Sequence, residues 1–129
     1  HSNSAADCIS RLETLVLTEA EMPLTAVRRQ IVSAVDLIVH LGRLRDRTRK
    51  VLEITEVCGL QDGEVVLNPL LRWEERETEL LSGEAAEGRE ELFLQEGSRV
   101  VGNLMLTGNR LRQREKLERL GIRDEEIPI

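Results

Sequence analysis

Apolar residues change from helical to strand spacing within residues 24–45. On one helical stripe, at i, i+4, i+7 and i+8, lie Val27, Ile31, Ala34 and Val35. Thr25 is a residue type that caps helix N-termini, so we expect the helix to begin there. Residues 37–41 form a short apolar run rich in β-branched side chains and ended by Gly42, which predicts a strand covered on both faces. A helix that leads directly into a buried strand is typical of a layered α/β domain.

Another amphipathic helix precedes this pair. Ser4 and Asp7 match the pattern in which a hydroxyl accepts from a first-turn amide, which predicts a helix over residues 5–18. Its expected apolar stripe consists of Ile9, Leu12, Leu15 and Val16. The residues expected to face outward are Arg11, Glu13 and Glu19. Pro23 separates the two helices, because the residue before a proline is pushed out of the α region.

An antiparallel meander is predicted to follow. Alternating or apolar runs predict strands at residues 36–45, 49–58 and 64–68, with a tight turn at Asp62 and Gly63. Antiparallel edge strands are common on mostly parallel sheets. We therefore expect an α/β fold in which helices pack on a sheet with an antiparallel edge.

The chain divides by composition into three parts. Residues 1–71 carry the predicted helices and meander, and residues 72–91 are acidic with little periodicity, which predicts a mobile segment with a solvated surface or an acidic docking surface. Residues 92–129 are expected to form a hairpin from 92–94 and 100–106, then a helix over 110–120. Gly121 is the expected residue after the helix end.

Composition limits the classes of function. The 129 residues are 40% hydrophobic, enough for one domain with an ordinary core. A net charge of −6 and 2% aromatic residues argue against nucleic-acid binding. Cys8 and Cys58 are too few for a disulfide framework and are expected to be small core residues in a reducing compartment. No apolar run reaches the roughly 18 to 20 residues of a membrane span, so a cytoplasmic location is expected.

Few residues suggest chemistry on their own. The sequence lacks the phosphate-binding loop, the dinucleotide fingerprint, the zinc-protease helix motif and the serine nucleophile motif. His1 and His40 are the only histidines; His40 is expected to be structural, and no metal site is expected. An Arg-Leu-Arg pattern occurs twice, with arginines at Arg43, Arg45, Arg110 and Arg112. Such clusters can bind phosphate or pair with carboxylates, and their roles stay open.

A series of short segments resembles the part of secretion and pilus-assembly ATPases that follows the Walker B strand. The matching segments lie at residues 1–4, 11–15, 23–24, 27–28, 30–31, 33–39, 43–46 and 54–57. His1-Ser2-Asn3-Ser4 resembles the family's His-Ala-Asn-Ser "His box", with Ser2 in place of alanine. Later, residues 101–102 and 107–110 resemble a glycine-containing strand and a Thr-Gly-x-Arg element. The chain is most similar to the CpaF/TadA branch, which drives Flp pili and is related to the type II and type IV secretion ATPases.

The resemblance implies the C-terminal part of a RecA-like P-loop ATPase. Such proteins assemble as a hexamer at the cytoplasmic side of the inner membrane, bind ATP and Mg²⁺, and act with membrane platform proteins in export or pilus assembly. The Walker A, Asp-box and Walker B elements would precede His1. We therefore expect this chain alone not to hydrolyse ATP, since the groups that bind the phosphates and Mg²⁺ are absent from it.

The same resemblance implies site residues. His1 would face the γ-phosphate in the intact enzyme, although it could also remain from a purification tag. Arg11, Arg28 and Gln30 match recurrent family positions and could contact nucleotide, brace the core or line a subunit boundary. Without preceding strands, the strand over 36–45 would have an exposed apolar edge, which predicts self-association.

Two readings outside the motor family stay open. One is a free-standing, non-enzymatic interaction domain that docks onto an ATPase ring. The other is a phosphate-binding module that uses both Arg-Leu-Arg clusters.

Overall fold

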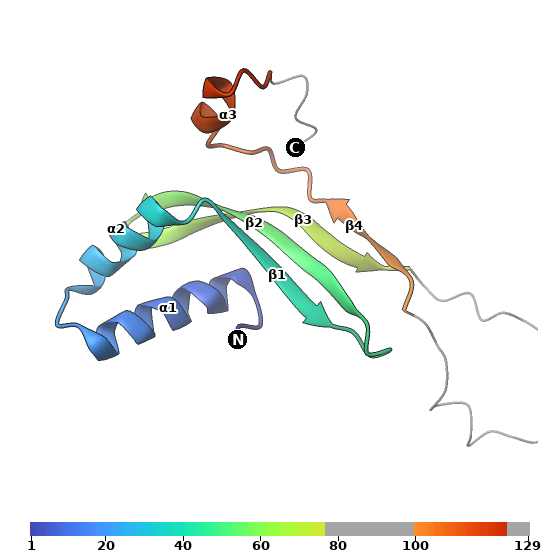
Figure 1. Cartoon of the computed structure of the whole chain (residues 1–129), viewed down its shortest axis with the longest axis horizontal. Helices are drawn as coiled ribbons and strands as arrows, with labels where there is room; N and C mark the ends of the chain where they lie inside the picture. Colours follow the sequence, from blue (N-terminus) through green and yellow to red (C-terminus); the bar gives the residue numbers. More distant parts are fainter. Residues whose placement is uncertain (77–99, 124–129) are drawn as a thin grey trace, which may run out of the picture.

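The computed structural model describes residues 1–76 and 100–123. The elements are α1 (Ala5–Glu19), α2 (Leu24–Ala34), β1 (Leu37–Arg43), β2 (Arg49–Gln61), β3 (Glu64–Glu75), β4 (Gly102–Leu106) and α3 (Glu115–Arg119). Figure 1 shows α1 and α2 on one side of the sheet and α3 beyond the other side. The fold is therefore mixed α/β, as predicted.

The four strands form one sheet in the order β1-β2-β3-β4, and each neighbouring pair is antiparallel. The predicted meander is thus confirmed. The expected parallel part of the sheet does not occur among the described strands. The expected hairpin partner at residues 92–94 lies outside the described residues, and β4 pairs with β3.

The core lies between the two long helices and one face of the sheet. Ile9, Val27 and Ile31 form its buried centre. The half-buried residues around them are Leu12, Val16, Met22, Val35, Ile38, Val65 and Leu67. The predicted helical stripes therefore supply the core, with the exception of Leu15, which is 63% exposed, and Ala34, which is exposed.

The prediction that β1 is covered on both faces was wrong, whereas its position at an edge agrees with the expected exposed edge. β1 lies at the edge of the described sheet, and Leu37, Val39 and Leu41 are 49%, 48% and 64% exposed. Because side chains alternate along a strand, these three point away from Ile38 and from the helices. An apolar run predicts burial on both faces, but α1 and α2 cover only one face here.

The two helix starts had different outcomes. The Ser4 hydroxyl accepts from the Asp7 amide at 3.0 Å, so the predicted cap of α1 is confirmed. Thr25 does not cap α2, because the helix begins one residue earlier, after Pro23. The Pro23 carbonyl already accepts from the amides of Ala26 and Val27, at 2.9 and 3.2 Å.

The later elements differ in length from the prediction. β3 continues beyond Pro69 to Glu75, so the start of the predicted acidic segment is part of a strand. The register of the β2–β3 ladder shifts beside Pro69, and this bulge accommodates a residue that lacks an N–H donor. The predicted helix over 110–120 is reduced to Glu115–Arg119, because the backbone before it bonds to the sheet instead. Gly121 adopts a φ of 77° after the helix end, as expected.

Candidate functional site

His1 and Arg11 line the same surface hollow, which has a volume of about 330 Å³. The other lining residues are Ser2, Cys8, Leu12, Thr14 and Leu15. Helix α1 creates this arrangement, because Cys8, Arg11 and Leu15 recur at three- and four-residue spacing on one of its faces. The structure thus brings together two of the four residues that the resemblance suggested.

The hollow combines an imidazole with a guanidinium group. Arg11 Nε donates to Asp7 Oδ2 at 3.2 Å, which holds the guanidinium near the start of α1. Asp7 also accepts from the Asn3 amide at 2.8 Å. The backbone hydrogen bond from Asn3 is the largest influence on the pKa of Asp7, and together with the Arg11 charge it lowers that pKa despite the opposing effect of burial. Asp7 is therefore ionised at neutral pH, and Arg11 is partly neutralised in this state.

Arg28 lies elsewhere and has a structural role. Its guanidinium donates to Glu13 at 2.8 Å, to Glu64 at 2.7 Å and to the Gly63 carbonyl at 2.7 Å. The hydrogen bonds to Glu13 and Glu64 raise its pKa. Arg28 therefore joins α1, α2 and the β2–β3 turn, and the expectation that Glu13 faces outward was wrong. Gln30 is exposed on α2 and does not line the hollow.

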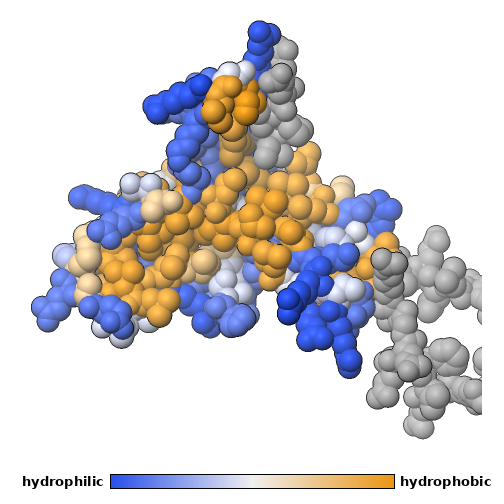
Figure 2. Space-filling view, in the orientation of Figure 1, coloured by the Kyte–Doolittle hydropathy of each residue, from blue (hydrophilic) through white to orange (hydrophobic). Residues whose placement is uncertain are grey.

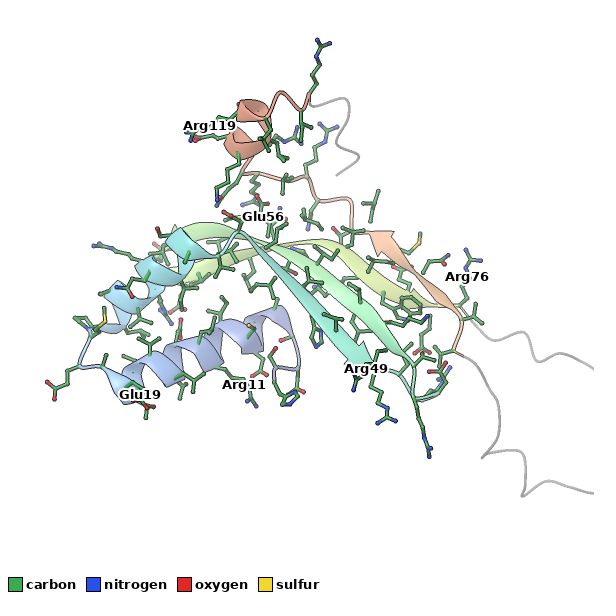
Figure 3. The ribbon with its side chains drawn as sticks, viewed as in Figure 1. Arg11, Glu19, Arg49, Glu56, Arg76 and Arg119 are labelled. Carbon is green, nitrogen blue, oxygen red and sulfur yellow. The ribbon has the colours of Figure 1, made fainter. Side chains whose placement is uncertain are left out.

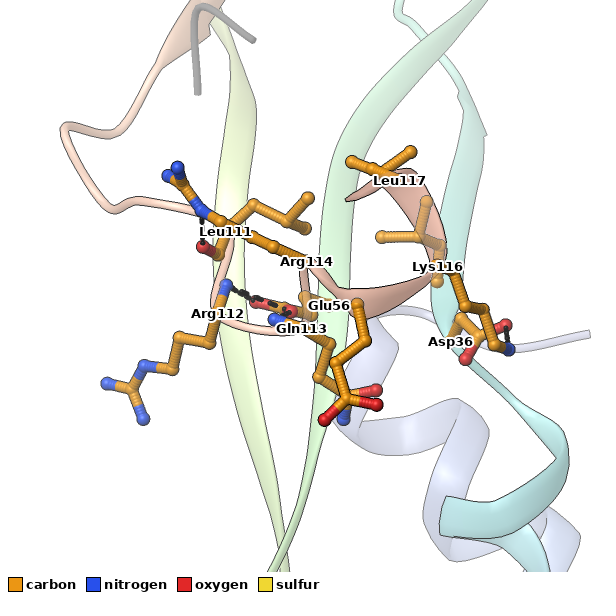
Figure 4. A pocket seen from close by; sticks show the side chains of 10 residues that line it. Asp36, Glu56, Leu111, Arg112, Gln113, Arg114, Lys116 and Leu117 are labelled. Carbon is orange, nitrogen blue, oxygen red and sulfur yellow. Dashed lines mark hydrogen bonds and ion pairs between the residues drawn. The ribbon is translucent and has the colours of Figure 1, made fainter. Parts of the chain in front are cut away.

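A second hollow, which the sequence did not predict, lies on the face of the sheet opposite α1 and α2. It has a volume of about 490 Å³ and lies between the first residues of β1, Glu56 of β2 and the chain before and within α3. Figure 4 shows Glu56 beside the backbone of the C-terminal segment, with Leu111 and Leu117 at the wall. We refer to residues 110–117 as the C-terminal segment.

Glu56 is the buried acceptor that holds this segment. It is 1% exposed, and its carboxylate accepts from the amides of Arg112 and Gln113 at 3.0 and 2.6 Å. Asn68 Nδ2 donates to the same carboxylate at 2.8 Å and to the Arg110 carbonyl at 2.9 Å. Burial acts to raise the pKa of Glu56, but these hydrogen bonds together outweigh it, so the pKa is lowered. A fully bonded, ionised carboxylate of this kind binds backbone and leaves little capacity for catalysis.

Other contacts complete the attachment. Gln113 Nε2 donates to the Val57 carbonyl at 2.8 Å, and Lys116 Nζ pairs with Asp36. Cys58 lies two residues after Glu56 on β2, and burial together with the hydrogen bond and charge of Glu56 raises the pKa of its thiol to about 11. The raised pKa keeps this thiol protonated at neutral pH. Cys58 and Cys8 are both half-buried and lie outside the buried core, so the expectation that they are core residues was wrong.

The two Arg-Leu-Arg clusters do not meet. Arg43 lies at the end of β1. The Arg112 amide donates to Glu56, whose partner in the strand register is Leu37 at the start of β1. The length of that strand separates them by roughly 20 Å at 3.3 Å per residue. A single phosphate site that uses both clusters is therefore not formed in this structure.

Comparisons with known proteins add no assignment. The chain matches no protein-family model, and no curated protein matches it. Within residues 1–76 and 100–123, no helix has the length and apolar character needed to cross a membrane. The same part of the chain holds no group of three or more His, Cys, Asp or Glu side chains arranged for a metal ion.

Proposed function

We propose that this chain is the C-terminal part of a RecA-like motor ATPase core of the secretion and pilus-assembly type. In this proposal it completes a nucleotide site whose phosphate-binding loop, Asp box and Walker B strand are supplied by preceding residues or by another chain. ATP and Mg²⁺ would bind to the completed enzyme, in a hexameric ring at the cytoplasmic side of the inner membrane. Membrane platform proteins would be its partners.

The observation that carries the proposal is the apolar face of the sheet opposite α1 and α2, which residues 1–76 and 100–123 leave partly open. In the strand register, Val39 pairs with Ile54, Ile54 with Leu71, and Leu71 with Leu106. Directly paired residues project from the same face, so one apolar row crosses all four strands. Figure 2 shows a broad hydrophobic area across the middle of the molecule, below α3.

An antiparallel sheet with helices on one face normally presents polar side chains on the other, so an apolar row on that second face calls for a cover. The C-terminal segment covers only the neighbouring row of this face, which contains Glu56 and Asn68. In the apolar row itself, Val39 and Leu106 remain 48% and 53% exposed. An open β1 edge beside this face is what a sheet with further strands and a second helical layer would leave. This supports a part of a larger layered domain.

His1 and Arg11 supply the second support. Both belong to segments that resemble the family, and they line one hollow although ten positions separate them. An imidazole and a guanidinium group that line one hollow both offer N–H donors, which suit a phosphate oxygen. In the proposed enzyme His1 contacts the γ-phosphate and Arg11 orients the first turn of α1 through Asp7.

The test begins with the native reading frame upstream of the His1 codon. The proposal expects a strand, a Gly-x-x-x-x-Gly-Lys-Ser/Thr loop and a helix there, and the longer polypeptide should hydrolyse ATP. In that polypeptide, replacing His1 by Ala should lower kcat roughly tenfold or more without preventing ring assembly. Thr14→Ala, which alters the same hollow without removing a titratable group, is the matched control.

A free-standing interaction domain is the second candidate, because the same apolar face suits docking onto another protein. A start codon directly before His1, with no phosphate-binding loop encoded upstream, would overturn the enzyme proposal for this polypeptide. The chain should then bind an ATPase ring, and Val39→Asp should abolish that binding while Leu15→Asp on α1 leaves it intact.

A further inference from the structure

We infer that the turn between β1 and β2 is a binding site for a phosphate group, formed by Arg43, Arg47 and Arg49. The basic turn, as we call residues 43–50, concentrates positive charge in a chain of net charge −6. It lies at the end of the molecule away from the C-terminus of α1, as the positions of Arg49 and Glu19 in Figure 3 show. The inference concerns these residues alone and does not depend on the proposed function.

Two cations of the basic turn already have partners on β3. Arg45 pairs with Glu75 of β3 at 3.0 Å, and Lys50 lies 5.9 Å from the centre of the Trp73 ring. Both therefore fasten the turn to β3. Arg43, Arg47 and Arg49 are exposed, and none of them forms an ion pair within the described part of the chain.

Arg43 and Arg49 are direct partners in the β1–β2 ladder. Directly opposed side chains leave the same face of the sheet, with Cα atoms about 5 Å apart. Like charges in this position repel each other and weaken the strand pairing. An oxyanion between the two guanidinium groups would convert that repulsion into paired hydrogen bonds.

Arg47, within the basic turn, has an unusual backbone conformation. Its φ of 65° lies in the left-handed region, where glycine is favoured and a side chain carries a conformational cost. A glycine at this position would avoid that cost. Its exposed side chain adds a third cation to the turn that Arg43 and Arg49 flank in sequence.

The turn is also built rigidly. Asp46 Oδ1 accepts from the Thr48 amide at 2.9 Å and from its hydroxyl at 2.7 Å, while Asp46 Oδ2 accepts from the Val100 amide at 2.8 Å. Leu44 and Thr48 close the turn with a backbone hydrogen bond of 2.8 Å. The arginines thus project from a fixed frame, which lowers the entropy lost when an anion binds.

The chemistry of the three side chains selects the ligand. Guanidinium groups have planar donor pairs that match phosphate oxygens, and a doubly charged phosphate can accept from several such groups at once. A single carboxylate has fewer oxygens and one charge. The ligand class is therefore a phosphate group, either free in solution or on a lipid headgroup.

The experiment is an NMR titration of the full chain with inorganic phosphate, in a buffer free of other polyvalent anions, observing arginine side-chain Nε–H signals. We expect saturable shifts that weaken at least about tenfold in Arg43→Gln with Arg49→Gln. Arg29→Gln, an exposed arginine on α2, is the matched control and should bind as the unmodified chain does. Absence of saturation, or equal binding by the double variant, would overturn the inference.

The variant Arg47→Gly separates a loss of phosphate binding from a loss of folding. Because glycine suits a positive φ, this variant should melt at the same or a higher temperature and yet bind phosphate several-fold more weakly. A variant that binds phosphate as tightly as the unmodified chain would count against a role for Arg47.

Two further arms identify the source of the phosphate. A lipid headgroup would be assigned if the unmodified chain sediments with phosphatidylglycerol vesicles but not with phosphatidylcholine vesicles. The double variant should then fail to sediment with either. Saturation by inorganic phosphate without vesicle binding would assign a soluble ligand. Binding of hexaglutamate without binding of phosphate or vesicles would overturn the inference in favour of an acidic protein.

Discussion

Glu56 and Asn68 are paired across β2 and β3, and the Asn68 side chain donates both to the Glu56 carboxylate and to the backbone of Arg110. This pair fastens the C-terminal segment to the face of the sheet opposite the helices. The backbone amides of Arg112 and Gln113 donate to the same carboxylate. One buried acidic side chain therefore joins parts of the chain that lie far apart in sequence.

Replacing Glu56 by Gln should destabilise the protein by about 2 kcal/mol, because an NH₂ group would then face amide donors and leave them unpaired. Urea unfolding measures the loss. The rate of hydrogen exchange should increase more at the amides of Arg112 and Gln113 than at the other amides. Glu74→Gln, at an exposed position on β3, is the control and should change neither quantity.

Stability should fall with acid in a way that depends on Glu56. The folded-state pKa values of Glu56 and Asp46 are lowered, so both groups stabilise the fold above their unfolded pKa values, at about 4. That contribution is lost as the pH falls through the lower, folded values. Urea midpoints measured between pH 7 and pH 3 should decline less steeply in Glu56→Gln. Parallel curves would show that Glu56 does not carry this dependence.

Gly102→Ala should destabilise the β3–β4 pairing. A Cβ at Gly102 would lie 2.7 Å from the Trp73 ring and would also collide with the Glu74 carbonyl oxygen. We expect a loss of roughly 1–3 kcal/mol and a change in the fluorescence of Trp73, the only tryptophan. In a Trp73→Leu background the same substitution should cost less, and additive effects would argue against a clash with the ring.

Cys58 should react slowly with thiol reagents. Its pKa of about 11 leaves little thiolate at pH 8, compared with a free thiol of pKa about 8.5. Mass spectrometry after iodoacetamide treatment should show slower labelling of Cys58 than of glutathione in the same solution. Glu56→Gln should accelerate the labelling, because it removes a negative charge beside the sulfur.

The features predicted from sequence are those set by near neighbours. The Ser4 cap depends on Asp7, three residues away, and the turn at Asp62 and Gly63 depends on residues that tolerate positive φ. Both were recognised correctly. The hydrophobic stripe of α2 was also read correctly at Val27 and Ile31, because helical periodicity directly reflects one buried face.

The features missed depend on distant partners. Glu56 gave no signal as a buried acceptor, since its donors lie 12, 56 and 57 positions away. The exposure of Val39 could not be inferred either, because an apolar run has the same pattern whether one face or both are covered. Pro69 suggested the end of β3, but the bulge in the β2–β3 ladder allows the strand to continue.

The sheet order also has a consequence for folding. Strands adjacent in space are adjacent along the chain, so the β2–β3 hairpin can form with a short loop and little loss of chain entropy. The bonds from Glu56 to Arg112 and Gln113 close a much longer loop. Pulsed hydrogen exchange during refolding should therefore detect protection of β2 and β3 amides before protection of the Arg112 and Gln113 amides. The face of the sheet opposite the helices is then the last to be covered, when the C-terminal segment attaches.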